Sequence, residues 1–278
     1  MSVTLERVSK AEVMERLHIS YSQLKTFLMC PQKYMYQYVI GAEWERKSAA
    51  LPFGSAIHKA VENYYRSLQE MGEILAVEVV VDVFNRVLEE QLNSEVEIIF
   101  KDGEDFASLR KQGAELLKVF LAEVKPQKIV GIEVPFSVKI PDLINDEGFL
   151  PIRLVGYFDL VEADGDGSYL VVDLKTSAQK YSSVRLEHDL QSSCYAYAMA
   201  QMGLATSENS TLVRYDVLLK QKKPSMERYY VSRTKDDHYR LVQLLNQVLR
   251  AIELRVFYRL NDWQCSDCPF AKRCVCDV

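Results

Sequence analysis

The spacing of apolar residues changes near Lys128, and this change limits the chain to folds that pack helices against a sheet. Before Lys128 helical spacing predicts a helix–turn–helix at 20–40, divided by Pro31, and helices at 53–71, 73–93 and 105–124. After it, alternating and β-branched stretches predict strands at 129–140, 152–163, 169–177, 211–220 and 227–232. Helical spacing returns at 188–203 and 235–257. The order predicts a mixed α/β fold, with a sheet flanked by helices.

Length and composition are typical of ordinary soluble globular proteins. The 278 residues are 48% hydrophobic and 26% charged, which excludes disordered and low-complexity architectures. The net charge of -5 excludes a uniformly basic surface but allows a locally basic cleft that binds nucleic acid. The charged start of the chain lacks the features of a signal peptide, and no apolar run is long enough to span a membrane. We therefore expect a cytoplasmic protein.

No linker rich in proline, glycine or serine divides the sequence, so we expect one domain over residues 1–278. Its expected parts are a mainly helical part at 20–125, a core at 126–234, and a helix with a cysteine cluster at 235–278. Ser20 is the predicted N-cap of the first helix.

Three charged residues on two predicted strands form a candidate reactive centre. Asp173 and Lys175 are two positions apart on an apolar strand, so their side chains project from the same face. Asp159 lies on the preceding strand, and a tight DGDGS turn brings it close to Asp173. Paired carboxylates need a neutralising cation, and Mg²⁺ or Mn²⁺ prefers such ligands. A lysine beside them can orient or deprotonate an attacking water, so the pattern fits a phosphodiesterase; a surface charge pair is the alternative.

The cysteines are unevenly placed. Cys30 and Cys194 stand alone, and the remaining four lie in the last fourteen residues, at Cys265, Cys268, Cys274 and Cys276. In a reducing compartment such thiols are read as metal ligands or buried thiols rather than disulfides. Four thiolates suit either Zn²⁺ or an iron–sulfur cluster. The four C-terminal cysteines are candidates for a local zinc site, although ligands only two positions apart are awkward for structural zinc. Cys194 is predicted to be a buried thiol.

Six short motifs occur in a fixed order. They are CPQKY (30–34), GSAIH (54–58), GYFD (156–159), DLK (173–175), QSSCY (191–195) and a terminal CxxC-x5-C (265–274). Together they resemble the PD-(D/E)XK nuclease superfamily, and more narrowly the RecB-like/Cas4-like exonucleases with an iron–sulfur cluster, also seen in the nuclease domain of AddB. The resemblance covers most of the chain. It implies a restriction-endonuclease-like core sheet flanked by helices, with a helical N-terminal elaboration and an iron–sulfur cysteine tail.

The resemblance also implies roles for single residues. Ligands of Mg²⁺ or Mn²⁺ would be His58, Asp159, Asp173 and the Leu174 carbonyl. Lys175 would be the catalytic lysine, and Gln191 and Tyr195 would support the site and contact DNA. Ligands of a [4Fe-4S] cluster would be Cys30, Cys265, Cys268 and Cys274. Glu133 is a further candidate to aid the metal site from a neighbouring strand, and Cys276 has no implied role.

The implied activity is that of a Mg²⁺- or Mn²⁺-dependent deoxyribonuclease, an exonuclease acting on single-stranded DNA or duplex ends. The alternative is a DNA-binding or scaffold subunit of a repair or CRISPR-adaptation complex, with little cleavage by the isolated chain. Protein partners would then be a helicase, a recombination protein or a CRISPR-adaptation protein. Candidate phosphate contacts are the lysines of KQKK (220–223). The tyrosines at 34, 36, 38, 64 and 65 are candidates for base stacking, with core packing as the alternative.

Overall fold

A central sheet with helices packed against it carries most of the candidate residues. The computed structural model describes residues 18–145, 148–163, 168–204 and 210–276. A five-stranded sheet has the order β3-β4-β5-β6-β7, with the strands Lys128–Pro141, Phe149–Ala163, Tyr169–Ser177, Ser210–Leu219 and Ser225–Thr234. Strands β5 and β6 pair in parallel, and the other neighbours are antiparallel. The parallel step requires a crossover, which contains α7 (Ser183–Glu187) and α8 (Leu190–Gln201).

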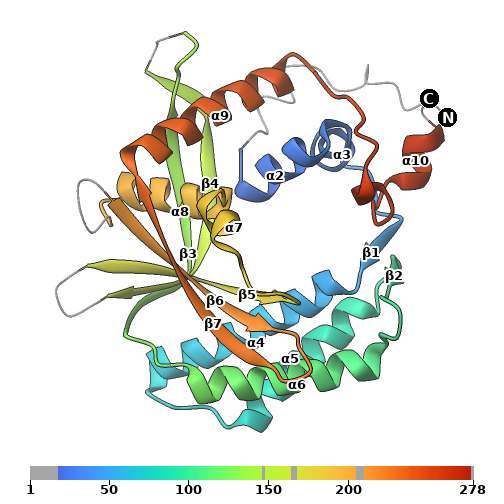
Figure 1. Cartoon of the computed structure of the whole chain (residues 1–278), viewed down its shortest axis with the longest axis vertical. Helices are drawn as coiled ribbons and strands as arrows, with labels where there is room; N and C mark the ends of the chain where they lie inside the picture. The colour runs from blue at the N-terminus through green and yellow to red at the C-terminus, as the bar shows by residue number, and fades with distance from the viewer. Residues whose placement is uncertain (1–17, 146–147, 164–167, 205–209, 277–278) are drawn as a thin grey trace.

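Helices cover both faces of the sheet (Figure 1). One face packs against α4 (Ala50–Met71), α5 (Val77–Leu92) and α6 (Phe106–Glu123). The other face packs against α2 (Tyr21–Met29), α8 and α9 (Lys235–Glu253). Each face has its own apolar core because amphipathic helices such as α4 and α9 present an apolar stripe to the strands, while α8 is buried on all sides. The expected mixed α/β fold is confirmed.

The remaining elements lie around the N- and C-terminal regions. After α2 come α3 (Pro31–Tyr34) and a π-helical segment, Met35–Ile40. A short parallel pair joins β1 (Arg46–Ser48) to β2 (Glu97–Ile99). The chain ends with a 3-10 turn, Trp263–Cys265, and α10 (Ala271–Cys276). Ser20 caps α2 as predicted, because its hydroxyl accepts a hydrogen bond from the Gln23 amide at 3.2 Å.

In strands β3 and β4, the alternation of side chains between the two faces of the sheet reverses at one pair of opposite residues. Phe158 packs in the core beneath α8, whereas Leu160, two residues later, packs against α4. In an undisturbed strand these two side chains would share one face. Opposite them, Ile132 packs on the α4 side and Val134 on the other, and the residue between, Glu133, has a φ of 50°. Both strands therefore bend at Glu133 and Asp159, which opens room for polar side chains between the two cores.

Some predicted boundaries and contacts differ from the structure. The last long helix was expected over 235–257 but ends at Glu253, because Arg255 adopts a left-handed φ of 57°. The short pair β1–β2 and helix α7 have no clear period in the sequence and were not predicted. The DGDGS turn falls largely outside the described residues. Among the described helices, none is both long and apolar enough to cross a membrane.

Candidate active site

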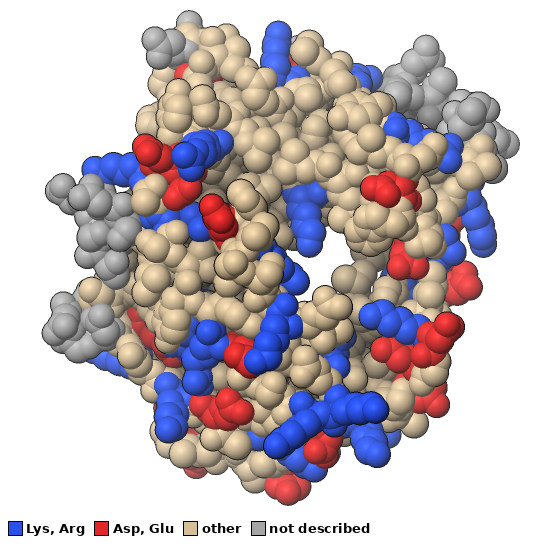
Figure 2. All heavy atoms as spheres, in the orientation of Figure 1, with Lys and Arg blue, Asp and Glu red and all other residues tan. Residues whose placement is uncertain are grey.

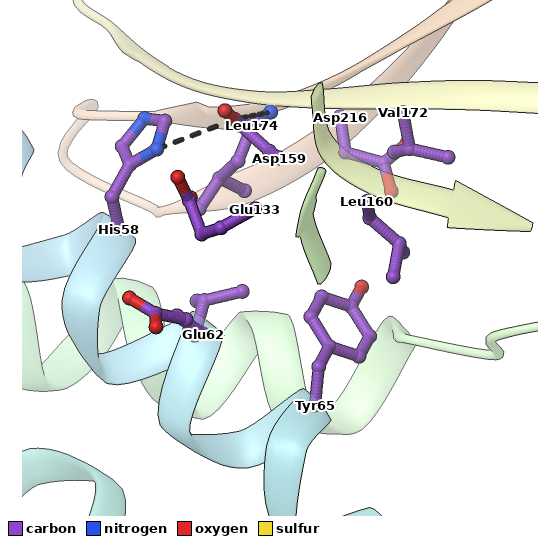
Figure 3. Close-up of a pocket in the computed structure, with 10 residues that line it drawn as sticks. His58, Glu62, Tyr65, Glu133, Asp159, Leu160, Val172, Leu174 and Asp216 are labelled. Atoms are coloured by element: carbon purple, nitrogen blue, oxygen red, sulfur yellow. Dashed lines mark hydrogen bonds and ion pairs between the residues drawn. The ribbon is translucent and has the colours of Figure 1, made fainter. Parts of the chain in front are cut away.

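Residues from three elements meet at the bend of the sheet, two through their side chains and one through its backbone. His58 lies on α4, and Asp159 lies on β4 at the bend itself. The Nδ1 atom of His58 is 3.3 Å from Oδ2 of Asp159, and the Leu174 amide donates to the same oxygen at 3.0 Å (Figure 3). The backbone of β5 is therefore tied to the Asp159 carboxylate. Leu174 thus contacts the site through its main chain while its side chain packs against α4.

Asp173 is a fully buried carboxylate held from two directions. Its Oδ1 accepts hydrogen bonds from Gln191 Nε2 at 2.9 Å and from Tyr195 Oη at 3.0 Å. Its Oδ2 lies 2.7 Å from Lys175 Nζ and accepts no well-aligned hydrogen bond from the described residues. The predicted same-face placement of Asp173 and Lys175 is confirmed. One carboxylate oxygen is thus fixed, and the other is held by a cation alone.

Helix α8 brings Gln191 and Tyr195 to this carboxylate. Asp189 caps the helix by accepting a hydrogen bond from the Ser192 amide at 2.8 Å, and Tyr215 also donates to Asp189. Gln191 and Tyr195 are one helical turn apart, and Gln191 Nε2 donates to Tyr195 Oη at 2.9 Å. The QSSCY motif therefore points both polar side chains at Asp173.

Burial and neighbouring charges change the ionisation of the buried pair. Burial raises the pKa of Asp173 to about 7; Lys175 opposes this rise, and the nearby charge of Asp159 adds to it. Burial acts to lower the pKa of Lys175, but the charges of Asp173 and Asp159 outweigh it and raise that pKa above its usual value. The lysine therefore stays charged beside a carboxyl group whose pKa is raised by burial.

His58 is biased toward its neutral form. Burial lowers its pKa below the usual value, and this outweighs the opposing effects of the Asp159 charge and a hydrogen bond to the Leu174 backbone. A neutral imidazole has a free lone pair and is the form that binds metal ions.

A small cavity beside His58 and Asp159 is lined by three more carboxylates, Glu133, Glu62 and Asp216 (Figure 3). The space open to the centre of a water molecule is about 20 Å³, enough for one water. Burial, with the charges of Asp159 and Glu62, raises the pKa of Glu133 to about 7. The sequence suggested Glu133 only as a further candidate to aid the metal site, and it did not suggest Glu62. Glu62 is four residues after His58 on α4, a helical spacing that places both on one face.

The candidate ligands are not gathered into a preformed metal site. Within the described part of the chain, no three histidine, cysteine, aspartate or glutamate side chains group closely enough to hold a metal ion. Asp173 points to Lys175, Gln191 and Tyr195, whereas Asp159 points to His58. The structure thus brings the expected ligands onto neighbouring elements as two pairs, not as one cluster.

A second cavity lies between the two ends of the chain. It is about 170 Å³ in volume and is lined by Cys30, Cys265, Cys268 and Cys274 together with Lys33 and Arg259. Cys30 follows the last turn of α2, and the other cysteines lie in the C-terminal segment. The Gln264 side chain donates to the Met29 carbonyl at 3.2 Å, which ties that segment to α2. Burial raises the pKa of the Cys268 and Cys274 thiols.

Other candidate residues lie in the cores or away from the site. Tyr34 and Tyr36 are buried, as are Tyr64 and Tyr65, so core packing explains these four rings. Cys194 is a buried thiol as predicted, and the Cys276 side chain is outside what the structure describes. In the KQKK stretch, the Lys220 ammonium lies 5.0 Å from the centre of the Phe53 ring.

Comparison with known proteins gives one matching family model and solved structures of low similarity. A crystal structure of a protein from Eubacterium rectale, provisionally named an exonuclease, matches with 17% identity and a TM-score of 0.49, over 92% of this chain and 86% of that one. The crystal structure of SSO0001 matches with 13% identity and a TM-score of 0.34, over 89% and 95%. The family model of the PD-(D/E)XK nuclease superfamily matches residues 18–275. Because that match spans nearly the whole described chain, the protein belongs to the PD-(D/E)XK nuclease superfamily.

Proposed function

We propose that this chain is a nuclease that hydrolyses phosphodiester bonds in DNA with the help of Mg²⁺ or Mn²⁺, acting on single strands or duplex ends. Membership of the superfamily gives the class of reaction. The observation that carries the proposal is the Asp173 carboxylate, which is fully buried, fixed through Oδ1 by Gln191 and Tyr195, and free of hydrogen bonds at Oδ2 except for its contact with Lys175. A buried charge arranged in this way is expected at a site that receives a cation.

The donor atoms suit a hard divalent cation. Asp159 and Asp173 would supply carboxylate oxygens, Leu174 its carbonyl oxygen, and neutral His58 a ring nitrogen. When bound, the cation would polarise the scissile phosphate and lower the pKa of the attacking water. Gln191 and Tyr195 hold Oδ1 of Asp173, which leaves Oδ2 for the ligand. Lys175, whose ammonium group is next to that oxygen, would stabilise negative charge on the phosphate or orient the water.

The shape of the molecule supports a strand as the substrate. Figure 2 shows an opening that passes through the molecule, and Lys and Arg side chains border it on this face. In Figure 1 the corresponding space lies between α2, α7 and α4. Positive charge in a hollow attracts the phosphate backbone of nucleic acid. The overall negative charge of the chain therefore does not oppose DNA binding at this place.

The cysteine cavity supports assignment to the RecB-like/Cas4-like branch with a [4Fe-4S] cluster. Four thiols from both ends of the chain line one space of about 170 Å³. A single zinc ion needs its four ligands within bonding distance of one point, and the described thiols do not group that closely, whereas a polynuclear cluster spreads its ligands over several metal atoms. Lys33 and Arg259 in the wall would offset the negative charge of a tetrathiolate cluster. The cluster would join α2 to the C-terminal segment.

Replacing Lys175 with alanine should strongly reduce cleavage, measured on protein that circular dichroism shows to be folded, because the variant also leaves the buried Asp173 carboxylate without its charge partner. We expect a loss of about 10²–10³-fold in the rate on end-labelled DNA with Mn²⁺, because the charge next to the reacting phosphate is removed. The matched control is Lys180→Ala, since Lys180 is exposed and pairs with Glu227. Equal rates for wild type and Lys175→Ala would contradict the proposed role. Wild-type cleavage that persists in EDTA would contradict the need for a cation.

Metal-free protein should lose stability as pH rises from about 4 to 7 because of Asp173. Its pKa is about 7 in the fold and about 3.9 unfolded, so the folded state binds more protons in this window. His58 and His238, whose pKa values are lowered by burial, act in the opposite direction. The measurement is therefore the difference in unfolding free energy between wild type and Asp173→Asn at each pH.

Between about pH 4 and 7, the unfolding free energy of wild type should fall relative to that of Asp173→Asn. The fall should be a few kcal/mol, since each pKa unit is worth about 1.4 kcal/mol. Mn²⁺ should reverse the shift in wild type alone, because a cation replaces the proton. Parallel pH curves for the two proteins would show that Asp173 does not titrate in this range.

Anaerobically purified wild type should contain about four iron atoms and matching acid-labile sulfide per chain. Cys268→Ser should lower the iron content sharply, since this thiol lines the cavity. Cys194→Ala should retain it, because Cys194 is buried in the sheet core. One zinc ion per chain and no iron would refute the cluster assignment.

A further inference from the structure

Two cation–aromatic pairs face the side of the sheet that carries Lys175. On α2, the Lys25 ammonium lies 5.9 Å from the centre of the Tyr21 ring. At α7, the Arg185 guanidinium lies 3.6 Å from the centre of the Tyr181 ring. The two helices border the opening described above (Figures 1 and 2). They come from segments far apart in sequence, so only the fold brings these pairs together.

The cations of this surface repel one another. Burial lowers the pKa of Lys25, and the positive charges of Lys175, Arg185 and Lys33 lower it further, while Asp189 opposes them. No carboxylate among the described residues forms an ion pair with Lys25, Lys33 or Arg185. Asp189 already accepts hydrogen bonds from the Ser192 amide and from Tyr215. A bound polyanion would neutralise these gathered charges, which is the usual reason for such a cluster.

Arg185 is held in position before any ligand binds. Its guanidinium stacks on Tyr181, whose ring is 5.5 Å from that of Tyr229 with an interplanar angle of 17°. The Tyr181 amide also donates to Tyr229 Oη at 3.2 Å. An arginine fixed by stacking loses less freedom when it binds a phosphate, and its planar fork matches phosphate oxygens. The stack therefore holds the Arg185 guanidinium in a position from which it can receive a phosphate at low entropic cost.

We propose that Tyr21, Lys25, Tyr181 and Arg185 form a strand-holding surface that binds the phosphates of a single DNA strand next to Lys175. Lys25 and Arg185 contact successive phosphates. Tyr21, which is only partly buried, offers its ring to an unpaired base, and duplex DNA presents no such base. The inference rests on the proposed nuclease function and adds the residues that select and position its substrate.

The test measures binding of a fluorescein-labelled oligo-dT of about 20 nucleotides in EDTA, so that no cleavage occurs. Lys25→Gln/Arg185→Gln is compared with Lys118→Gln/Arg250→Gln, which makes the same change in net charge. Lys118 and Arg250 form exposed ion pairs with Glu115 and Glu253 on α6 and α9. Circular dichroism and thermal melting establish that all proteins are folded.

We expect the first double variant to bind about tenfold or more weakly at low salt, and the control to bind like wild type. The slope of log affinity against log salt should fall by about 1.4, which is 0.7 for each of two lost phosphate contacts on a single strand. Tyr181→Leu should weaken binding in the same direction, whereas Tyr181→Phe keeps the ring and should bind normally.

Three results would overturn the proposal, and they separate it from the proposed function. If wild type cleaves DNA and Lys25→Gln/Arg185→Gln binds with unchanged affinity and salt slope, the strand-holding surface is wrong but the nuclease function stands. If the control pair weakens binding equally, the effect is one of overall charge and the surface is again wrong. If wild type neither binds nor cleaves any DNA, both proposals fall.

Discussion

The arrangement of the site depends on one buried carboxylate, that of Asp173. A charge with no solvent exposure is costly unless it is hydrogen-bonded and paired. Gln191 and Tyr195 supply the hydrogen bonds from α8, and Lys175 supplies the charge from the same strand. The crossover helix, the sheet and the candidate catalytic lysine are thus coupled through two oxygen atoms, and a shift in any of them exposes an unsatisfied group.

The bend of β3 and β4 explains how polar groups reach this place without opening either core. Each core keeps its own apolar residues, and the side-chain alternation reverses at Glu133 and Asp159. A positive φ at a residue with a long side chain is uncommon and is typical of functional sites. Nearby, Gly156 is tightly packed: a Cβ there would lie 2.5 Å from the Phe136 ring, which accounts for the glycine of the GYFD motif.

Periodicity predicted the strands, most helices and the face shared by Asp173 and Lys175, because those features follow from local sequence. The spacing of Gln191 and Tyr195 likewise placed both on one side of α8. The bend could not be predicted, since nothing local in Glu133 signals a left-handed backbone. Glu62 was missed because an acidic residue on a helix is usually solvated, and only the fold places it beside His58. The predicted ligands of one metal ion lie as two pairs among the described residues, and their joint binding of a cation stays a prediction.

We propose that the Asp173–Lys175 pair and the Asp159–His58 pair come together as one cation site. Anomalous diffraction from crystals of the protein soaked in Mn²⁺ tests it directly. We expect one strong peak within about 2.0–2.5 Å of carboxylate oxygens from both Asp159 and Asp173, with the Leu174 carbonyl and His58 also in contact. A peak bound only elsewhere, or no peak while Lys175 remains on Asp173, would contradict it.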